Sequence, residues 1–228
     1  MMLGARTGAW AKSGEWVNPY VTDGLVAMWD GEWNAGGGKH DASAVEWADL
    51  VGGGGSIPIA ANYSWDEKAL VHNSAGNVIF CENDISEFVQ VEFVCEIPNV
   101  VNGEYFGIGN ESVKSAGIVY WFTGVGISRR GITNQTGFPT TTFSSASVSA
   151  VSALNVTSAY INGVETTATL GSASSWNNHY YLRWSIGGEI YHPSTQFRLK
   201  CVRIYSRALT ASEIAANYAV DKARFNLP

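Results

Sequence analysis

The residues with the clearest chemical potential lie in a polar stretch near the start of the chain. The stretch DGEWNAGGGKHD begins at Asp30, and Glu32 and Asn34 place further side-chain oxygens at every second position, with Asp41 at the twelfth. Oxygen ligands at this spacing are typical of a calcium loop. The sixth position is Ala35, where an EF-hand needs glycine, and no helix is expected on either side. Calcium is therefore one interpretation, and a hydrogen-bonded Asx-rich loop is the favoured one.

Aromatic residues are the main compositional excess, with nine Trp, ten Tyr and nine Phe among 228 residues. An aromatic face can stack on the C–H groups of a sugar ring while polar neighbours hold the hydroxyl groups. Two tryptophans stand in polar loop contexts: Trp65 beside Asp66, and Trp176 beside Asn177 and His179. These five residues form the predicted carbohydrate-binding set. Packing in the core is the competing interpretation, and we favour it for three other tryptophans: Trp29, Trp121 and Trp184.

Charge and metal-ligand spacing exclude other functions. The chain has 14 Lys and Arg against 20 Asp and Glu, a net charge of −6, whereas phosphate binding needs clustered basic residues. The adjacent pair Arg129–Arg130 is interpreted as a solvated turn. The four histidines are scattered and show no paired metal spacing. We expect no nucleic-acid partner and no required cofactor, with calcium as the one possible ion.

The cysteines and the N-terminus bear on the cellular location. Cys81, Cys95 and Cys201 are an odd number without short spacing, so they predict small core residues rather than a disulfide framework. The first residues contain no continuous apolar region, so no secretory signal is expected. No run of about 18 apolar residues exists, and we expect no membrane insertion.

The chain divides into an N-terminal arm or linker, residues 1–20, and one domain, residues 21–228. The arm contains Gly, Ala and Trp without a clear period, and Trp10 and Trp16 indicate a surface that meets a partner. The domain contains roughly a dozen short apolar runs separated by turn signals, which is typical of a sandwich or barrel.

Three stretches define the expected local structure. Val89–Ile97 alternates apolar and polar residues and predicts a strand with one buried face. Asn162–Gly163, between SAYI and VETT, predicts a type I′ hairpin turn. Val51–Ser56, VGGGGS, predicts a flexible turn.

The C-terminal stretch predicts one strand followed by a capped helix. Residues 197–205 alternate and then become apolar on both faces, as in a buried strand. Thr210 and Glu213 have the spacing of a capping box. Ile214 and Tyr218 would share the apolar face of the helix. Two cations fall in its last turn, where they suit the helix dipole: Lys222 and Arg224.

The segment RIYSRALTASEIAANY resembles the closing signature of laminin G-like, concanavalin A-like jelly-roll domains, in which the last strand ends in an R-I-Y-x-R-x-L corner before a short helix. A second similarity lies in GLVAMWDGEWN, residues 24–34, and EWADL, residues 46–50. The resemblance spans Gly24 to Phe225. It implies an all-β fold, an antiparallel two-sheet jelly-roll sandwich with a short C-terminal helix on its rim. This fold hosts lectins, glycosidases, adhesion modules and virion proteins, so it does not decide the function.

The stretch ENDISE is similar to the E-x-D-x-x-E motif of laminarinase-type glycosidases, which share this fold. There, alternate carboxylates on a concave strand supply nucleophile and acid, and the resemblance implies these roles for Glu82, Asp84 and Glu87. The family typically has an apolar residue at the position of Asn83, and clear alternation starts only at Val89. A polar turn that leads into a strand is the favoured interpretation.

Three functions remain open. We favour a non-catalytic binding or adhesion module, directed at a glycan and displayed on a phage virion or microbial surface, where residues 1–20 would contact other virion or surface proteins. Assembly into a homo-oligomer stays open. The alternatives are a purely structural capsid or tail decoration protein, and a glycoside hydrolase that uses the E-x-D-x-x-E motif.

Overall fold

The computed structural model describes the following residues: 16–72, 79–84, 89–96, 103–109, 117–122, 126–130, 135–137, 145–151, 158–167, 181–184 and 197–228. Within them, eight antiparallel strands form the larger sheet, in the order β14–β13–β12–β7–β16–β5–β4 with β1 also paired to β16. Their bounds are β1 (Leu25–Asp30), β4 (Tyr63–Trp65), β5 (Leu70–His72), β7 (Gln90–Glu96), β12 (Ser145–Val151), β13 (Ser158–Ile161), β14 (Val164–Thr167) and β16 (Phe197–Tyr205).

A second antiparallel sheet contains six of the described strands, in the order β11–β10–β9–β8–β15–β6. Their bounds are β6 (Ile79–Asp84), β8 (Gly103–Gly109), β9 (Gly117–Phe122), β10 (Gly126–Arg130), β11 (Gln135–Gly137) and β15 (Tyr181–Trp184). A separate short pair joins β2 (Glu46–Trp47) to β3 (Ile57–Pro58). The chain ends in helix α1 (Ala211–Phe225).

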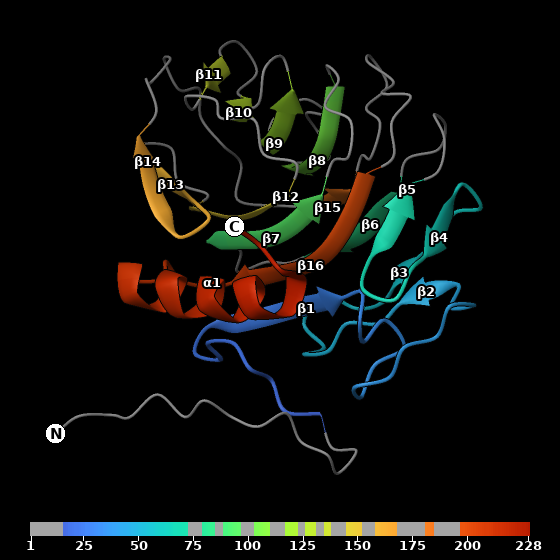
Figure 1. Cartoon of the computed structure of the whole chain (residues 1–228). Coiled ribbons are helices and arrows are strands. Elements are labelled where there is room, and N and C mark those ends of the chain that lie inside the picture. The colour runs from blue at the N-terminus through green and yellow to red at the C-terminus, as the bar shows by residue number, and fades with distance from the viewer. Residues whose placement is uncertain are drawn as a thin grey trace, which may run out of the picture.

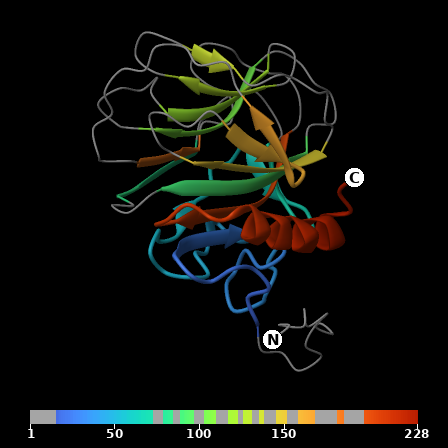
Figure 2. The same cartoon turned by 90° about the vertical axis from the view of Figure 1, so that its left-hand side faces the viewer.

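The two sheets and the helix form three layers. The six-stranded sheet lies on one side of the eight-stranded sheet, and α1 lies across the opposite side (Figures 1 and 2). The predicted jelly-roll sandwich with a C-terminal helix is therefore confirmed. The expected place of the helix on the rim is wrong, because its side chains contact Ser147 of β12, Glu92 of β7 and Arg203 of β16 across the outer sheet face.

Two local predictions, the helix cap and the hairpin turn, are confirmed, and a third, the turn at Arg129–Arg130, is wrong. Thr210 and Glu213 form the predicted capping box of α1, and Asn226 ends the helix in the left-handed conformation. Asn162 and Gly163 both have positive φ between paired β13 and β14, as a type I′ turn requires. Arg129–Arg130, expected in a turn, instead lies within β10.

The buried face of α1 is polar, which differs from the prediction. Ile214 and Phe225 are buried as apolar anchors, but the face between them carries Asn217, Asp221 and Arg224. Tyr218, expected on the apolar face, is only partly buried. None of the helices in the described part of the chain is long and apolar enough to cross a membrane.

Strand β7 is buried on both faces, whereas its alternation predicted one buried face. Val91 and Phe93 are fully buried, and so are the polar residues Gln90 and Glu92 at alternate positions. Gln90 donates to Ser149 and accepts a hydrogen bond from the Leu209 backbone, 2.6 and 2.7 Å. The polar face is covered because the helix brings hydrogen-bonding partners to it.

Arg203 of β16 is the centre of this buried polar layer, with a fully buried side chain. Its Nη1 and Nη2 donate to the two carboxylate oxygens of Asp221, both at 2.8 Å, and its Nε donates to Glu92 at 3.0 Å. Its Cζ lies 3.9 Å from the centre of the Tyr20 ring. Asn217 donates to the same Glu92 oxygen at 2.7 Å. Burial raises the pKa of Glu92, while Arg203 opposes that rise.

Arg224 forms a second buried ion pair beside the first. Its guanidinium donates to both oxygens of Asp30, at 2.7 and 2.9 Å, and to Glu32 at 2.8 Å. It also donates to the Tyr20 hydroxyl at 2.7 Å, and that hydroxyl donates to Asp221 at 2.8 Å. Tyr20 therefore connects the two arginine sites, and burial raises its pKa well above the ordinary value.

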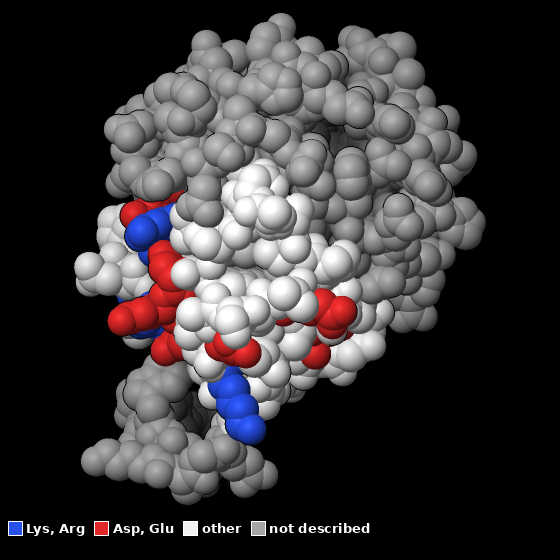
Figure 3. Space-filling model, turned by 90° about the vertical axis from the view of Figure 1, so that its right-hand side faces the viewer, with Lys and Arg blue, Asp and Glu red and all other residues white. Residues whose placement is uncertain are grey.

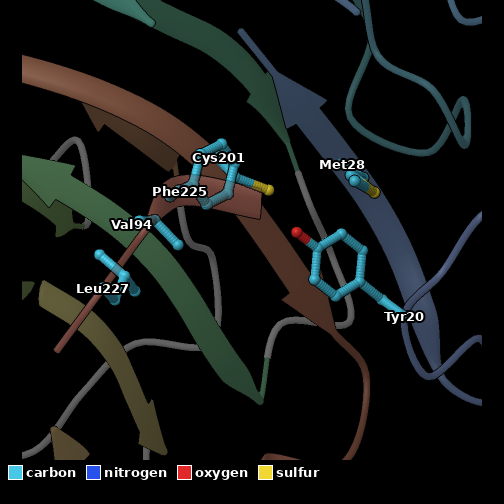
Figure 4. Close-up of a cluster of buried hydrophobic side chains, with 6 residues drawn as sticks. All are labelled: Tyr20, Met28, Val94, Cys201, Phe225 and Leu227. Atoms are coloured by element: carbon cyan, nitrogen blue, oxygen red, sulfur yellow. The ribbon is translucent and has the colours of Figure 1, made fainter. Parts of the chain in front are cut away.

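The segment 16–21 packs on its own domain. Tyr20 lies in a buried cluster between α1 and the sheet, together with the other residues drawn in Figure 4: Met28, Val94, Cys201, Phe225 and Leu227. The rings of Trp16 and Trp33 pack edge to face with centroids 5.7 Å apart, so Trp16 packs against its own chain. The described end of the predicted arm is thus engaged within the domain, while Trp10 lies outside the described residues.

Asp49 orders the glycine-rich turn that the sequence predicted to be flexible. Its carboxylate accepts backbone hydrogen bonds from Met28, Val51, Gly54 and Gly55, at 2.7 to 3.2 Å. A Cβ added to Gly54 would lie 2.5 Å from the Trp29 ring. The glycines here allow close approach of the turn to the sheet rather than flexibility.

Two of the three cysteines are buried core residues, as predicted. Cys95 and Cys201 are free and buried, and the side chain of Cys81 lies outside the described residues. Burial raises the pKa of Cys95 to about 12 and that of Cys201 well above its ordinary value. Neither thiol forms a thiolate at neutral pH, so neither is suited to nucleophilic chemistry.

Replacing Arg203 with Gln should lower the free energy of unfolding by about 3–5 kcal/mol, because Asp221 and Glu92 would stay buried without their cation. Urea denaturation measures the loss. Arg207→Gln is the matched control: Arg207 pairs with Asp23 and Glu213 in a partly exposed site and should cost much less. Equal losses in the two variants would contradict the central role of Arg203.

Asp49→Asn should destabilise the fold by about 2 kcal/mol, because one carboxamide oxygen cannot replace a carboxylate that accepts four N–H groups. Thermal unfolding reports the change. Asp66→Asn is the control, since Asp66 accepts one backbone hydrogen bond, from Lys68, and its ion pair with Arg198 is partly exposed.

Cys95 and Cys201 should resist alkylation in the native protein at pH 8 and react readily in denaturant. Peptide mapping after iodoacetamide treatment reads each site separately. Rapid labelling of either cysteine in the native protein would show that the interior opens more often than its packing indicates.

Candidate functional site

The predicted calcium loop is held together by hydrogen bonds and an ion pair. Both carboxylate oxygens of Asp30 accept from Arg224, and Glu32 accepts from the same guanidinium. Asn34 donates to the Asp41 carbonyl and accepts from the Asp41 N–H, both at 2.8 Å. The side chains of Asp30 and Asn34 are fully buried in these contacts.

Asp41 completes this loop as an Asx turn. Its carboxylate accepts from the backbone and the hydroxyl of Ser43, at 2.8 and 2.7 Å, and these bonds lower its pKa. Among the residues that the structure describes, no three His, Cys, Asp or Glu side chains are arranged to hold a metal. The geometry supports the hydrogen-bonded loop, and calcium there stays a sequence prediction.

Trp65, at the end of edge strand β4, has a fixed and partly exposed ring. Its Nε1 donates to the Ala44 carbonyl at 2.8 Å, and its ring packs edge to face on buried Trp47 with centroids 5.4 Å apart. Trp47 in turn donates to the Asp30 carbonyl at 3.0 Å. One side of the indole is thus anchored, while part of it remains accessible to a ligand.

Asp66 follows Trp65 and begins a row of charges that runs from partly exposed Asp66 to buried Lys200. Its carboxylate lies 3.4 Å from Arg198 of β16; Arg198 lies 3.8 Å from Glu96 of β7, and Lys200 contacts the same Glu96 at 3.0 Å. Figure 3 views the side of the molecule where β4 and β5 lie and shows acidic and basic side chains on this face. Trp65 and Asp66 therefore share one sheet edge but make separate contacts.

The structure describes only some of the other predicted site residues. Glu82 and Asp84 lie within β6, so the polar turn expected there is wrong up to residue 84, where the strand continues through both positions. Glu87 lies outside the described residues, as do Trp176, Asn177 and His179. The core prediction is confirmed for Trp29, which is fully buried; the side chains of Trp121 and Trp184 lie outside the described residues.

The burial of His72, the last residue of β5, was not predicted from the sequence. The side chain is fully buried, and neither ring nitrogen has a hydrogen-bond partner. Its ring contacts that of Tyr63 on β4, with centroids 5.1 Å apart, and burial lowers the pKa of the imidazole. The apolar run that precedes it, ALV, was the only sequence signal for this burial.

Comparison with solved structures supports the architecture. A Trypanosoma rangeli sialidase in complex with sialic acid matches with a TM-score of 0.61 and 16% identity, covering 94% of this chain and 36% of that chain. The botulinum neurotoxin type G receptor binding domain matches with a TM-score of 0.59 and 12% identity, covering 87% and 52%. The chain thus spans about a third and about half of these proteins, and at such identity the likeness concerns the fold alone.

Sequence comparison identifies the family. No curated protein matches the chain. The laminin G model described as the concanavalin A-like lectin/glucanases superfamily matches residues 94–215, more than half of the chain. This segment runs from within β7 to the first turns of α1, and it contains all of β16 and the capping box that begins the helix. The chain therefore belongs to the concanavalin A-like lectin/glucanase superfamily, as the resemblance of its closing strand and helix implied.

Proposed function

We propose that the chain is a non-catalytic binding module that recognises a glycan at the β4 edge of its larger sheet. The observation that carries the proposal is the ring of Trp65, which is partly exposed and held in one orientation by Ala44 and Trp47. A ring that is already ordered loses little conformational entropy when a sugar stacks on it.

Polar groups at the same sheet edge, although they make contacts separate from those of the ring, suit a ligand rich in hydroxyl groups. Asp66 and Arg198 offer carboxylate and guanidinium groups, and their mutual distance of 3.4 Å is that of a loose ion pair. Exposed ion pairs contribute little free energy. Ligand hydroxyls could therefore replace this ion-pair contact at small cost, which favours a polar ligand over an apolar one.

The comparisons support this function at the level of fold. The similar solved structures include a sialidase bound to sialic acid and a domain named for receptor binding. Analogy of fold raises the expectation of a glycan ligand without identifying one. Display on a virion or microbial surface stays a prediction from the sequence. Residues 16–20 pack on the domain, so the predicted contact of the arm with other surface proteins would be made by residues 1–15.

A glycoside hydrolase is the second candidate, favoured by one observation. Strand β6 runs through Glu82 and Asp84, so the two carboxylate residues occupy alternate positions of a strand, as the E-x-D-x-x-E motif requires. Release of reducing sugar from a panel of glucans tests this function. Turnover that Glu82→Gln abolishes without loss of folding would favour the hydrolase.

Trp65→Ala should weaken binding of the best ligand from a glycan array by at least about tenfold, which corresponds to ~1.4 kcal/mol of stacking. Titration calorimetry measures the affinity. Trp65→Phe should retain part of it, because a smaller aromatic face remains. Trp33→Phe is the control, since Trp33 is another partly buried tryptophan, with its ring packed on Arg224.

The same titration with a chelator separates the two sequence predictions. Binding that survives chelation agrees with the hydrogen-bonded loop at Asp30–Asp41. Binding lost on chelation would restore calcium at that loop. Unchanged affinity of Trp65→Ala would remove the β4 edge as the glycan site.

A further inference from the structure

The buried histidine His72 lies on β5, next to the strand that carries the proposed ligand contact, Trp65. His72 of β5 is paired in register with Tyr63 of β4, and Trp65 is paired with Leu70 on the same two strands. The His72 side chain is fully buried, and neither of its ring nitrogens has a hydrogen-bond partner. A neutral imidazole tolerates this environment far better than an imidazolium.

The groups around His72 that the structure describes offer it no counter-charge. On β4, the neighbouring ring is Tyr63. On β16, Phe197 is its register partner, and the next residue, Arg198, is aligned with Val71 and forms its ion pairs with Asp66 and Glu96. In the turn between β4 and β5, Glu67 and Lys68 are exposed. None of these described carboxylates contacts the ring.

We propose that protonation of His72 opens the β4–β5 edge of the sheet in mildly acidic solution. The release of a glycan held at Trp65 would follow from this opening; that consequence rests on the function proposed above, whereas the opening itself does not. The imidazolium would gain water only when the two strands separate from the sheet.

The edge is built so that local opening is feasible. Strands β4 and β5 are three residues each, and β4 is the terminal strand of the sheet, so few backbone hydrogen bonds hold them. The buried ion pairs of Arg203 and Arg224 involve α1, β1, β7, β16 and segment 16–21, and they include no side chain of β4 or β5. Opening would have to release the hydrogen bond from Lys68, in the turn between β4 and β5, to the Arg224 carbonyl at 2.9 Å. The edge can therefore open while the remaining layers stay folded.

The sign of the pH effect follows from the pKa of His72, which is lower in the closed state than its ordinary value of about 6.5. The open state binds the extra proton, so stability of the closed edge is present above pH 6.5 and is lost as the pH falls towards the lowered pKa. Glu92 acts in the opposite direction, since burial raises its pKa and the folded state takes up its proton first. Glu92 therefore cannot account for opening on acidification.

Hydrogen exchange of the intact chain between pH 7.5 and 5.5 tests the proposal. Protection factors of β4 and β5 amides, corrected for intrinsic exchange, should fall as the pH drops below 6.5, by up to about tenfold per pH unit, because linkage to one proton changes the equilibrium at most tenfold per unit. The hairpin of β13 and β14, at the opposite edge of the same sheet, should show no such fall. His72→Phe should abolish the fall, and His40→Gln, which removes an exposed histidine, should leave it intact.

Protection factors of β4 and β5 that stay constant with pH, or that fall equally in His72→Phe, would overturn the proposal. If His72→Phe does not fold, His72→Leu or NMR titration of the wild-type imidazole decides, and a His72 pKa at or above 6.5 would overturn it. Glycan affinity over the same pH range separates the two proposals. Absence of a ligand at every pH removes the binding function, while the exchange data still decide the role of His72.

Discussion

The packing of α1 on the sheet depends on two arginines that are buried together with their carboxylates. Among the described residues at this interface, Asp30, Glu92 and Asp221 are fully buried around Arg203 and Arg224. A hydrophobic interface of similar volume would stabilise the fold as well or better, because desolvation offsets much of the attraction between buried charges. What the ion pairs add is selectivity: a shift of α1 by one turn would leave several charges buried without partners. The helix can therefore dock in one register only.

This constraint extends to the start of the described chain. Tyr20 donates to Asp221 on the helix and accepts from Arg224, while the Val21 N–H donates to Asn217 at 2.9 Å. The beginning and the end of the domain thus complete each other's hydrogen bonds. The outer layer forms only when both are in place, so its contacts are long-range in sequence. An edge away from this layer is free to vary in stability without loss of the fold.

The sequence specifies the architecture through patterns that act locally. The capping box at Thr210, the turn at Asn162–Gly163 and the alternation along β7 each have a physical signature within a few residues, and each element forms where it was expected. The buried polar face was not predictable in this way. Glu92, Asp221 and Arg224 have the types and positions of solvent-facing residues, and only partners from distant strands make them interior.

The same reason explains the candidate site: Trp65 was identified by its polar neighbours, whereas its anchors, Ala44 and Trp47, are distant in sequence. His72 gave no positive signal, because an unpartnered buried ring is defined by what the fold fails to supply.

The contrast between His72 and the arginine layer shows how one sheet can hold both a rigid and a responsive region. In the arginine layer every guanidinium is held by carboxylates, and both arginines keep their charge at any physiological pH. At the β4–β5 edge the buried titratable group has no partner, and its ordinary pKa lies within the range that cells and their surroundings reach. A charge that is always present stabilises one arrangement under all conditions, whereas a charge that appears on acidification acts only then. The partly exposed ring of Trp65 lies on the second kind of structure. Placing a ligand contact there would let proton concentration alter binding while the ion pairs keep the rest of the sandwich folded.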